Sequence, residues 1–156
     1  MPMTPTIVCN NILKRAFEDG ISVSPMKLQK LMYFVSCEYA KATGTNLLTE
    51  DFCVWQYGPV LPSIYTEFKG FGSSSITSYA KDANGDSYAI DEASAPNLRE
   101  AINRVWRAFQ NYNGIELSRI THQNGSGWTS AYDQQREKIT LDDMKADHTY
   151  EQYMFL

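Results

Sequence analysis

Two pairs of helix start and stop signals near the N-terminus constrain the fold of this chain most strongly. Thr4-Pro5 and Ser24-Pro25 each place a good N-cap residue before a proline, which suits the first position of a helix. Gly20 and Gly44 follow at positions where a left-handed residue would end each helix. Between these signals, apolar residues recur at helical spacing: Val8, Ile12, Leu13, Ala16 and Phe17, then Leu28, Leu31, Met32, Val35 and Tyr39. The chain is therefore predicted to begin with an antiparallel pair of helices.

A short segment rich in aromatic residues and prolines comes next. Residues 52–56 (FCVWQ) are β-branched or aromatic and too few for a helix, so they predict a strand. Pro59 and Pro62 keep the preceding residues extended, because a residue before proline avoids the helical region. Pro62 can also open a short helix with one apolar face: Ile64, Tyr65, Phe68 and Phe71. The sequence favours a fold-shaping role for the aromatics of this corner, with Tyr57 as the first candidate for a contact.

The rest of the chain adds one hairpin and several helices to the prediction. Residues 76–80 and 87–90 flank Asn84-Gly85, a pair that favours a tight antiparallel turn. Helices are expected over 96–112, around 116–121, and from Thr140 to the C-terminus, where residues 140–143 resemble a capping box. The predicted fold class is α+β and predominantly helical, with about five to six helices and one small antiparallel β-sheet of two to three strands.

The composition argues against several functional classes. A net charge of −4 is unsuited to general binding of nucleic acid or anionic membranes. The three cysteines are far apart and lack CxxC spacing, which argues against both a disulfide framework and a zinc site. No apolar run approaches the length of a membrane span, and the N-terminus lacks a signal pattern. We therefore expect a cytoplasmic protein without a metal, a cofactor or a membrane partner.

No motif predicts catalysis. The chain lacks HExxH, GxSxG and the phosphate-binding glycine motifs. His122 could serve Cys37 or Cys53 as a nucleophile, but both cysteines lie in apolar segments, where a buried thiol is normally inert. The favoured interpretation is structural, with the His122 ring holding the adjoining loop by hydrogen bonds. We expect no enzyme, and a small hydrolase using His122 is the alternative.

Three segments together resemble the Panacea domain family, also called the SocA-like antitoxin domain. They are MKLQKLMYF at 26–34, VWQYGPVLPSIYTEFKGFG at 54–72 and LSRITHQNGSGWTSAY at 117–132. Their order and spacing agree with the family. The resemblance assigns residues 1–132 to this domain and leaves 133–156 as a C-terminal helical extension packed on it. Gly127 stands where the family commonly has proline, which is expected to loosen the turn before Trp128.

The resemblance implies an antitoxin of a bacterial or prophage toxin–antitoxin system, which neutralises a protein toxin by direct contact. The adjacent gene is the expected source of that toxin. The alternative implied by the family is a proteolytic adaptor, or phage-encoded regulator, that delivers a host protein to an AAA+ protease. Self-association into a homo-oligomer through an apolar helix face is also open.

The candidate residues fall into two sets. The proposed partner-binding residues are Lys27, Gln29, Lys30, Trp55, Tyr57 and Tyr65. The proposed structural residues of the family motif are Leu28, Leu31, Tyr33, Gly58, Pro59, Val60, Ser118, Thr121, His122 and Trp128. Lys27, Lys30 and Lys41 are expected to lie mostly off the inward face of their helix. Gln29 and Lys30 are expected to hydrogen-bond either the following loop or a partner.

Overall fold

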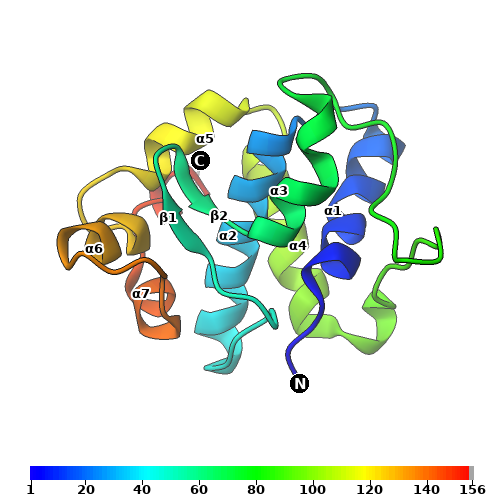
Figure 1. Cartoon of the computed structure of the whole chain (residues 1–156). Coiled ribbons are helices and arrows are strands. Elements are labelled where there is room, and N and C mark those ends of the chain that lie inside the picture. Colours follow the sequence, from blue (N-terminus) through cyan, green and yellow to red (C-terminus); the bar gives the residue numbers. More distant parts are fainter. Residues whose placement is uncertain (155–156) are drawn as a thin grey trace.

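The helix α2 (Pro25–Thr43) lies in the middle of the molecule, and most other elements pack around it (Figure 1). We describe a computed structural model, which covers residues 1–154. In it, α2 contacts α1 (Pro5–Asp19), α3 (Pro62–Phe68), α4 (Pro96–Phe109), α5 (Gly114–Thr121) and α7 (Leu141–Ala146). It also contacts β2 (Gly58–Val60), which pairs with β1 (Cys53–Trp55). The remaining elements are α6 (Gly127–Asp133) and the short 3-10 helices Lys69–Phe71, Glu92–Ser94 and Glu151–Tyr153.

The predicted fold class is confirmed, with one more helix than expected. Residues 1–154 form seven α-helices and a single two-stranded antiparallel sheet. The proline starts and glycine stops of the first two helices lie where the sequence places them. The Ser24 hydroxyl accepts the backbone N–H of Lys27 at 3.2 Å, and Gly20 and Gly44 are left-handed, with φ of 66° and 75°.

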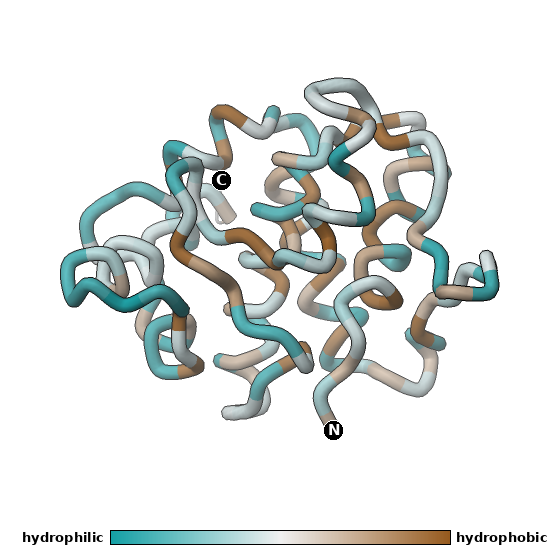
Figure 2. Tube along the Cα trace, in the orientation of Figure 1, coloured by the Kyte–Doolittle hydropathy of each residue, from teal (hydrophilic) through white to brown (hydrophobic). Residues whose placement is uncertain are grey.

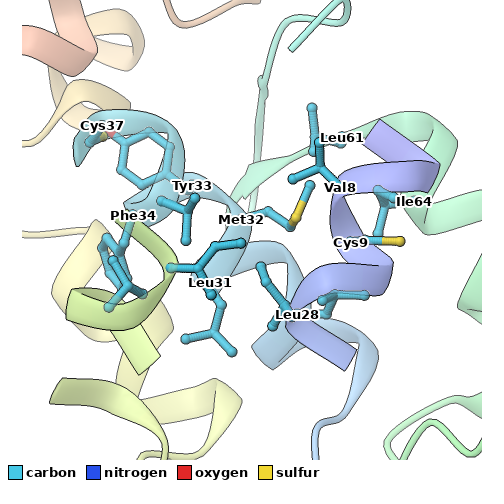
Figure 3. Close-up of a cluster of buried hydrophobic side chains, with 14 of the residues drawn as sticks. Val8, Cys9, Leu28, Leu31, Met32, Tyr33, Phe34, Cys37, Leu61 and Ile64 are labelled. Carbon is cyan, nitrogen blue, oxygen red and sulfur yellow. The ribbon is translucent and has the colours of Figure 1, made fainter. Parts of the chain in front are cut away.

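A continuous apolar core forms where α2 meets its neighbours. Figure 3 shows Leu28, Leu31 and Met32 of α2 beside Val8 and Cys9 of α1 and Leu61 and Ile64 near α3. On another side of α2, Phe34 stacks on Phe109 of α4 with ring centroids 4.9 Å apart. Burying such side chains stabilises the fold by roughly 1.5–3 kcal/mol each. Both sides of α2 are therefore covered, and little of the helix is left to face solvent.

The lysines of α2 do not follow the sequence-based expectation. Lys27 and Lys30 were expected mostly off the inward face, yet they are 4% and 1% exposed. The prediction assumed one buried face, as on a surface helix, whereas a central helix has neighbours on all sides. Lys41 at the other end of α2 is only half-buried. Two of these side chains must therefore find partners inside the protein.

The hairpin predicted for residues 76–90 is wrong. The turn at Asn84-Gly85 forms, but its flanks are irregular and unpaired, because side chains of α1 bond their backbone. The Asn10 amide donates to the carbonyls of Ala80 and Tyr88 at 3.1 and 2.8 Å and accepts the N–H of Ala80 at 2.8 Å. Asn11 makes the same donor–acceptor pair with Ile90, with both distances 2.9 Å. The antiparallel pair lies instead at 53–60.

The last helix is shorter than predicted. The capping box forms between Thr140 and Asp143, but α7 ends at Ala146, and Asp147 is extended, with φ −81° and ψ 105°. The buried Asp147 carboxylate accepts the hydroxyl of Tyr33 at 2.6 Å and the N–H of Gly127 at 3.0 Å. These bonds draw the chain inward and stop the helix. The predicted continuation through residues 155–156 lies outside the described residues.

The helix α6 was not predicted, because only a turn was expected before Trp128. Ser126 is its N-cap, and the Ser126 hydroxyl accepts the N–H of Thr129 at 3.0 Å. The connection from α6 to α7 is hydrophilic over residues 134–138, the teal stretch at the left of Figure 2, and then reaches the buried Ile139. A serine two residues before a tryptophan was the available signal for this helix.

Candidate interaction site

The β1–β2 hairpin projects the aromatic corner of the sequence from the body of the protein. Cys53 pairs with Val60, Val54 with Pro59 and Trp55 with Gly58, so Gln56 and Tyr57 form the connecting turn. A two-stranded hairpin is at best marginally stable on its own. Its shape must therefore come from the elements that contact it.

Side chains from α5 and α6 hold three successive carbonyls of this turn. The Trp128 indole N–H donates to the carbonyl of Trp55 at 2.9 Å. Nε2 of the His122 ring lies 2.9 Å from the Gln56 carbonyl oxygen, and the Ser118 hydroxyl donates to the Tyr57 carbonyl at 2.6 Å. The backbone of the turn is therefore fixed from one side, while the side chains of Gln56 and Tyr57 are exposed to solvent.

Side chains of α2 hold the second half of the same segment. The Lys30 amine donates to the carbonyl of Pro59 at 3.2 Å. The Gln29 amide pairs with Leu61, donating to its carbonyl at 3.0 Å and accepting its N–H at 2.8 Å. Lys27 points elsewhere and donates to the Gln110 carbonyl at the end of α4. The carbonyl-holding set thus comprises Gln29, Lys30, Ser118, His122 and Trp128.

Gly58 allows these segments to approach the hairpin closely. Its φ of +115° is one that side-chain-bearing residues rarely adopt. A Cβ at this position would lie 2.7 Å from the Thr121 hydroxyl oxygen and 2.9 Å from Cε of Lys30. Only glycine therefore lets α2, α5 and the hairpin meet at this point.

Both ring nitrogens of His122 face backbone carbonyls. Nδ1 lies 2.6 Å from the carbonyl oxygen of Ser118, opposite the Nε2 contact with Gln56. The ring can donate an N–H to either carbonyl. The ring also packs on Trp128, with centroids 4.2 Å apart. His122 thus takes the loop-holding position that the sequence favoured, and neither of its nitrogens hydrogen-bonds a cysteine sulfur in the described residues.

The turn before Trp128 is tied down rather than loosened by Gly127. The N–H of Gly127 donates to Asp147, a bond that a proline could not make. A Cβ on Gly127 would lie 2.3 Å from the Tyr33 hydroxyl oxygen. Glycine therefore suits this chain because Tyr33 and Asp147 occupy the space that a side chain would need.

Three aromatic side chains around the hairpin are exposed, against the expectation that they mainly shape the fold. Trp55, Tyr57 and Tyr65 are 39%, 60% and 48% exposed. Tyr65 was expected on the apolar face of its helix, but Ile64 and Phe68 alone are buried there. Trp55 and Tyr65 pack edge to face, with centroids 5.1 Å apart. We call Trp55, Tyr57 and Tyr65 the aromatic face.

A cleft of ≈ 270 Å³ opens beside the aromatic face. Its walls come from the start of α2, the hairpin, α3 and the segment after it: Pro25, Met26, Gln29, Lys30, Trp55, Tyr57, Val60, Tyr65, Lys69 and Gly72. Burial lowers the pKa of Lys30 at its base to about 7. The cleft thus brings together all the predicted partner-binding residues except Lys27. Sequence reasoning missed Met26 and Lys69, which carry no distinctive pattern.

The cysteines considered as nucleophiles lie in unreactive surroundings. Cys37 is fully buried in α2, and burial raises the pKa of its thiol well above the ordinary value. Burial also raises the pKa of the Cys53 thiol on β1. Among residues 1–154, no group of three or more histidine, cysteine, aspartate or glutamate side chains is placed to hold a metal. The helices of that same range include none with the length and hydrophobicity of a membrane span.

Comparison with known proteins links this geometry to one family. The chain is 29% identical over 124 residues to "Antitoxin SocA" of Caulobacter vibrioides (strain NA1000 / CB15N). That match covers 78% of this chain and 66% of the relative, so the chain spans just under two thirds of the relative's length. No solved structure matches the chain. The family model "Antitoxin SocA-like, Panacea domain" matches residues 28–129, which include the whole carbonyl-holding set and the aromatic face. The chain therefore belongs to the antitoxin SocA-like, Panacea domain family.

Proposed function

We propose that this protein is an antitoxin that neutralises a partner toxin by direct binding through the aromatic face. The single observation that supports this best is that the hairpin has a fixed backbone and outward-facing aromatic side chains. Five side chains fix the carbonyls of residues 55, 56, 57, 59 and 61, while Trp55 and Tyr57 project outward. A surface whose backbone is already ordered loses less conformational entropy on binding.

The chemistry of the aromatic face suits a protein partner. Tyrosine and tryptophan are enriched in protein interfaces, because they bury a large ring at low entropic cost and retain a polar atom for hydrogen bonding. Such residues also dominate the binding energy where they fill pockets. In this proposal the toxin is encoded by the adjacent gene, and the two proteins meet in the cytoplasm. Gln29 holds the Leu61 backbone, whereas Lys27 bonds Gln110 and lies outside the cleft.

The test is co-expression with the product of the adjacent gene, using Tyr57→Ala in place of the wild type. Because Tyr57 is mostly exposed, its truncation should change the free energy of unfolding by no more than about 0.5 kcal/mol. Binding should nevertheless weaken by at least roughly tenfold, as expected for a central interface aromatic. Protection from toxicity, co-purification and melting temperature are the three measurements.

Tyr88→Ala is the matched control, because Tyr88 is 57% exposed and lies on the irregular 80–90 segment away from the hairpin. It should protect as well as the wild type. Equal protection by Tyr57→Ala and Tyr88→Ala would show that the toxin is not bound through the aromatic face. If the product of the adjacent gene is harmless when expressed alone, the proposed antitoxin function itself is rejected. Faster turnover of the partner only when this protein is present would indicate the proteolytic adaptor instead.

A further inference from the structure

Lys30 is a buried lysine whose ammonium form has hydrogen-bonding capacity to spare. An ammonium has three donors, and in the described residues Lys30 hydrogen-bonds only the Pro59 carbonyl. No carboxylate of residues 1–154 forms an ion pair with it. Buried lysines are normally paired, because removing an ammonium from water is costly. The position therefore lacks the anion that would stabilise its charge.

The surroundings of Lys30 do not supply that anion either. The titratable groups that line the cleft besides Lys30 are Tyr57 of the turn, Tyr65 of α3 and Lys69 of the segment after α3. The element α5 contributes the uncharged Thr121 beside Gly58 and Lys30. Among the described lining residues there are two lysines and no acid. In a chain of net charge −4, this cleft is locally cationic and walled by aromatic rings.

We propose that the cleft accepts a carboxylate-bearing segment of the protein partner, with the carboxylate on the Lys30 ammonium and a neighbouring apolar side chain against the rings of Trp55, Tyr57 and Tyr65. This inference rests on the proposed antitoxin function and names the chemistry of the contact. Val60 and Met26 supply further apolar wall. A charge-assisted bond in a cleft screened from water is stronger than one on an open surface.

The pH dependence follows from the position of Lys30. Its pKa is about 7, so the free protein carries the ammonium below that pH and the neutral amine above it. A bound carboxylate stabilises the ammonium, so binding takes up a proton whenever the free amine is neutral. Affinity should therefore be highest below pH 7 and should weaken as the pH rises past 7, by up to roughly tenfold per pH unit.

A small probe tests this without the toxin. The probes are 3-phenylpropionate and its uncharged analogue 3-phenylpropanamide, titrated into the full chain while backbone amide shifts are followed by NMR. At pH 6 the carboxylate should bind about tenfold more tightly than the amide, with shifts at residues 55–58, 60 and 65. At pH 8.5 this preference should largely disappear. Lys30→Met, which matches the shape of the buried stem, should fold and bind both probes equally at both pH values.

Lys145→Met is the control, because Lys145 is an exposed lysine on α7. It should keep the wild-type preference for the carboxylate and its pH dependence. Equal binding of acid and amide by the wild type, shifts outside the cleft, or absence of carboxylate binding at pH 6 would each overturn the proposal. Any of these results combined with intact toxin neutralisation would leave the antitoxin function standing and reject only the carboxylate contact.

Discussion

Gly58 joins three distant parts of the chain at a single backbone position. It lies in the hairpin, against Lys30 of α2 and Thr121 of α5. The left-handed region and the close approach both exclude a side chain here. The residue is thus a geometric requirement of the family motif, independent of any partner.

Gly58→Ala should lower the free energy of unfolding by about 2–4 kcal/mol, because strain and a forced displacement of Lys30 or Thr121 add together. Gly70→Ala is the matched control. A Cβ on Gly70 would have no atom within 4 Å, and its φ is not in the positive range. Urea denaturation measures both variants, and equal midpoints would contradict the close approach.

Residue roles could be predicted where a residue type has only one common use. From the sequence, Gly58 was assigned to the structural residues of the family motif, and the His122 ring was predicted to hold the adjoining loop. The sequence could not indicate that Lys30 is buried, because a lysine on an amphipathic helix normally lies at the surface. Burial of Lys30 depends on the Pro59 carbonyl reaching it, which is a tertiary contact between residues 29 positions apart.

At the scale of elements, the segment 76–90 shows how side chains can replace a strand partner. The Asn84-Gly85 pair between residues 76–80 and 87–90 predicted a hairpin, and the turn did form. The flanking backbone groups instead bond Asn10 and Asn11 of α1, at separations of 70 to 79 residues. No local pattern encodes such a contact, since an asparagine inside a helix looks like an ordinary polar position.

Asn10→Ala tests this replacement of a strand by a side chain. It would leave the buried N–H and C=O of Ala80 without partners, so stability should fall by about 2–3 kcal/mol. Hydrogen exchange at residues 80–90 should also accelerate. Asn84→Ala, in the exposed turn, should change neither quantity appreciably. Unchanged exchange at Ala80 in Asn10→Ala would show that the backbone has another partner.

At the scale of the whole molecule, the C-terminal segment is fastened to α2 by buried polar groups. Asp147 accepts from Tyr33 at 2.6 Å, and the Tyr150 hydroxyl donates to Glu38 at 2.5 Å. Lys41 donates to the Tyr150 hydroxyl at 2.7 Å and to the Asp147 carbonyl. The family match ends at residue 129, before this segment. We propose that residues 133–154 belong to an extension that folds as one unit with the domain.

Asp147→Ala should expose this coupling, because the Tyr33 hydroxyl and the Gly127 N–H would both lose their buried acceptor. We expect a loss of about 2–5 kcal/mol and a single cooperative transition at a lower temperature. Asp142→Ala, on the exposed side of α7, should cost less than about 1 kcal/mol. A calorimetric scan of Asp147→Ala that showed two separate transitions would mean that the extension melts independently.

The way the hairpin is held also bears on how such a protein can change its target. All five contacts of the carbonyl-holding set meet backbone oxygens, which are the same whatever residue carries them. Trp55, Tyr57 and Tyr65 can thus be exchanged without removing a bond from the frame. A library randomised at these three positions would vary recognition on a constant scaffold, as antibody loops do. The matched family region spans this scaffold and the three aromatic positions together, so a match to it identifies the family and leaves the bound partner unspecified.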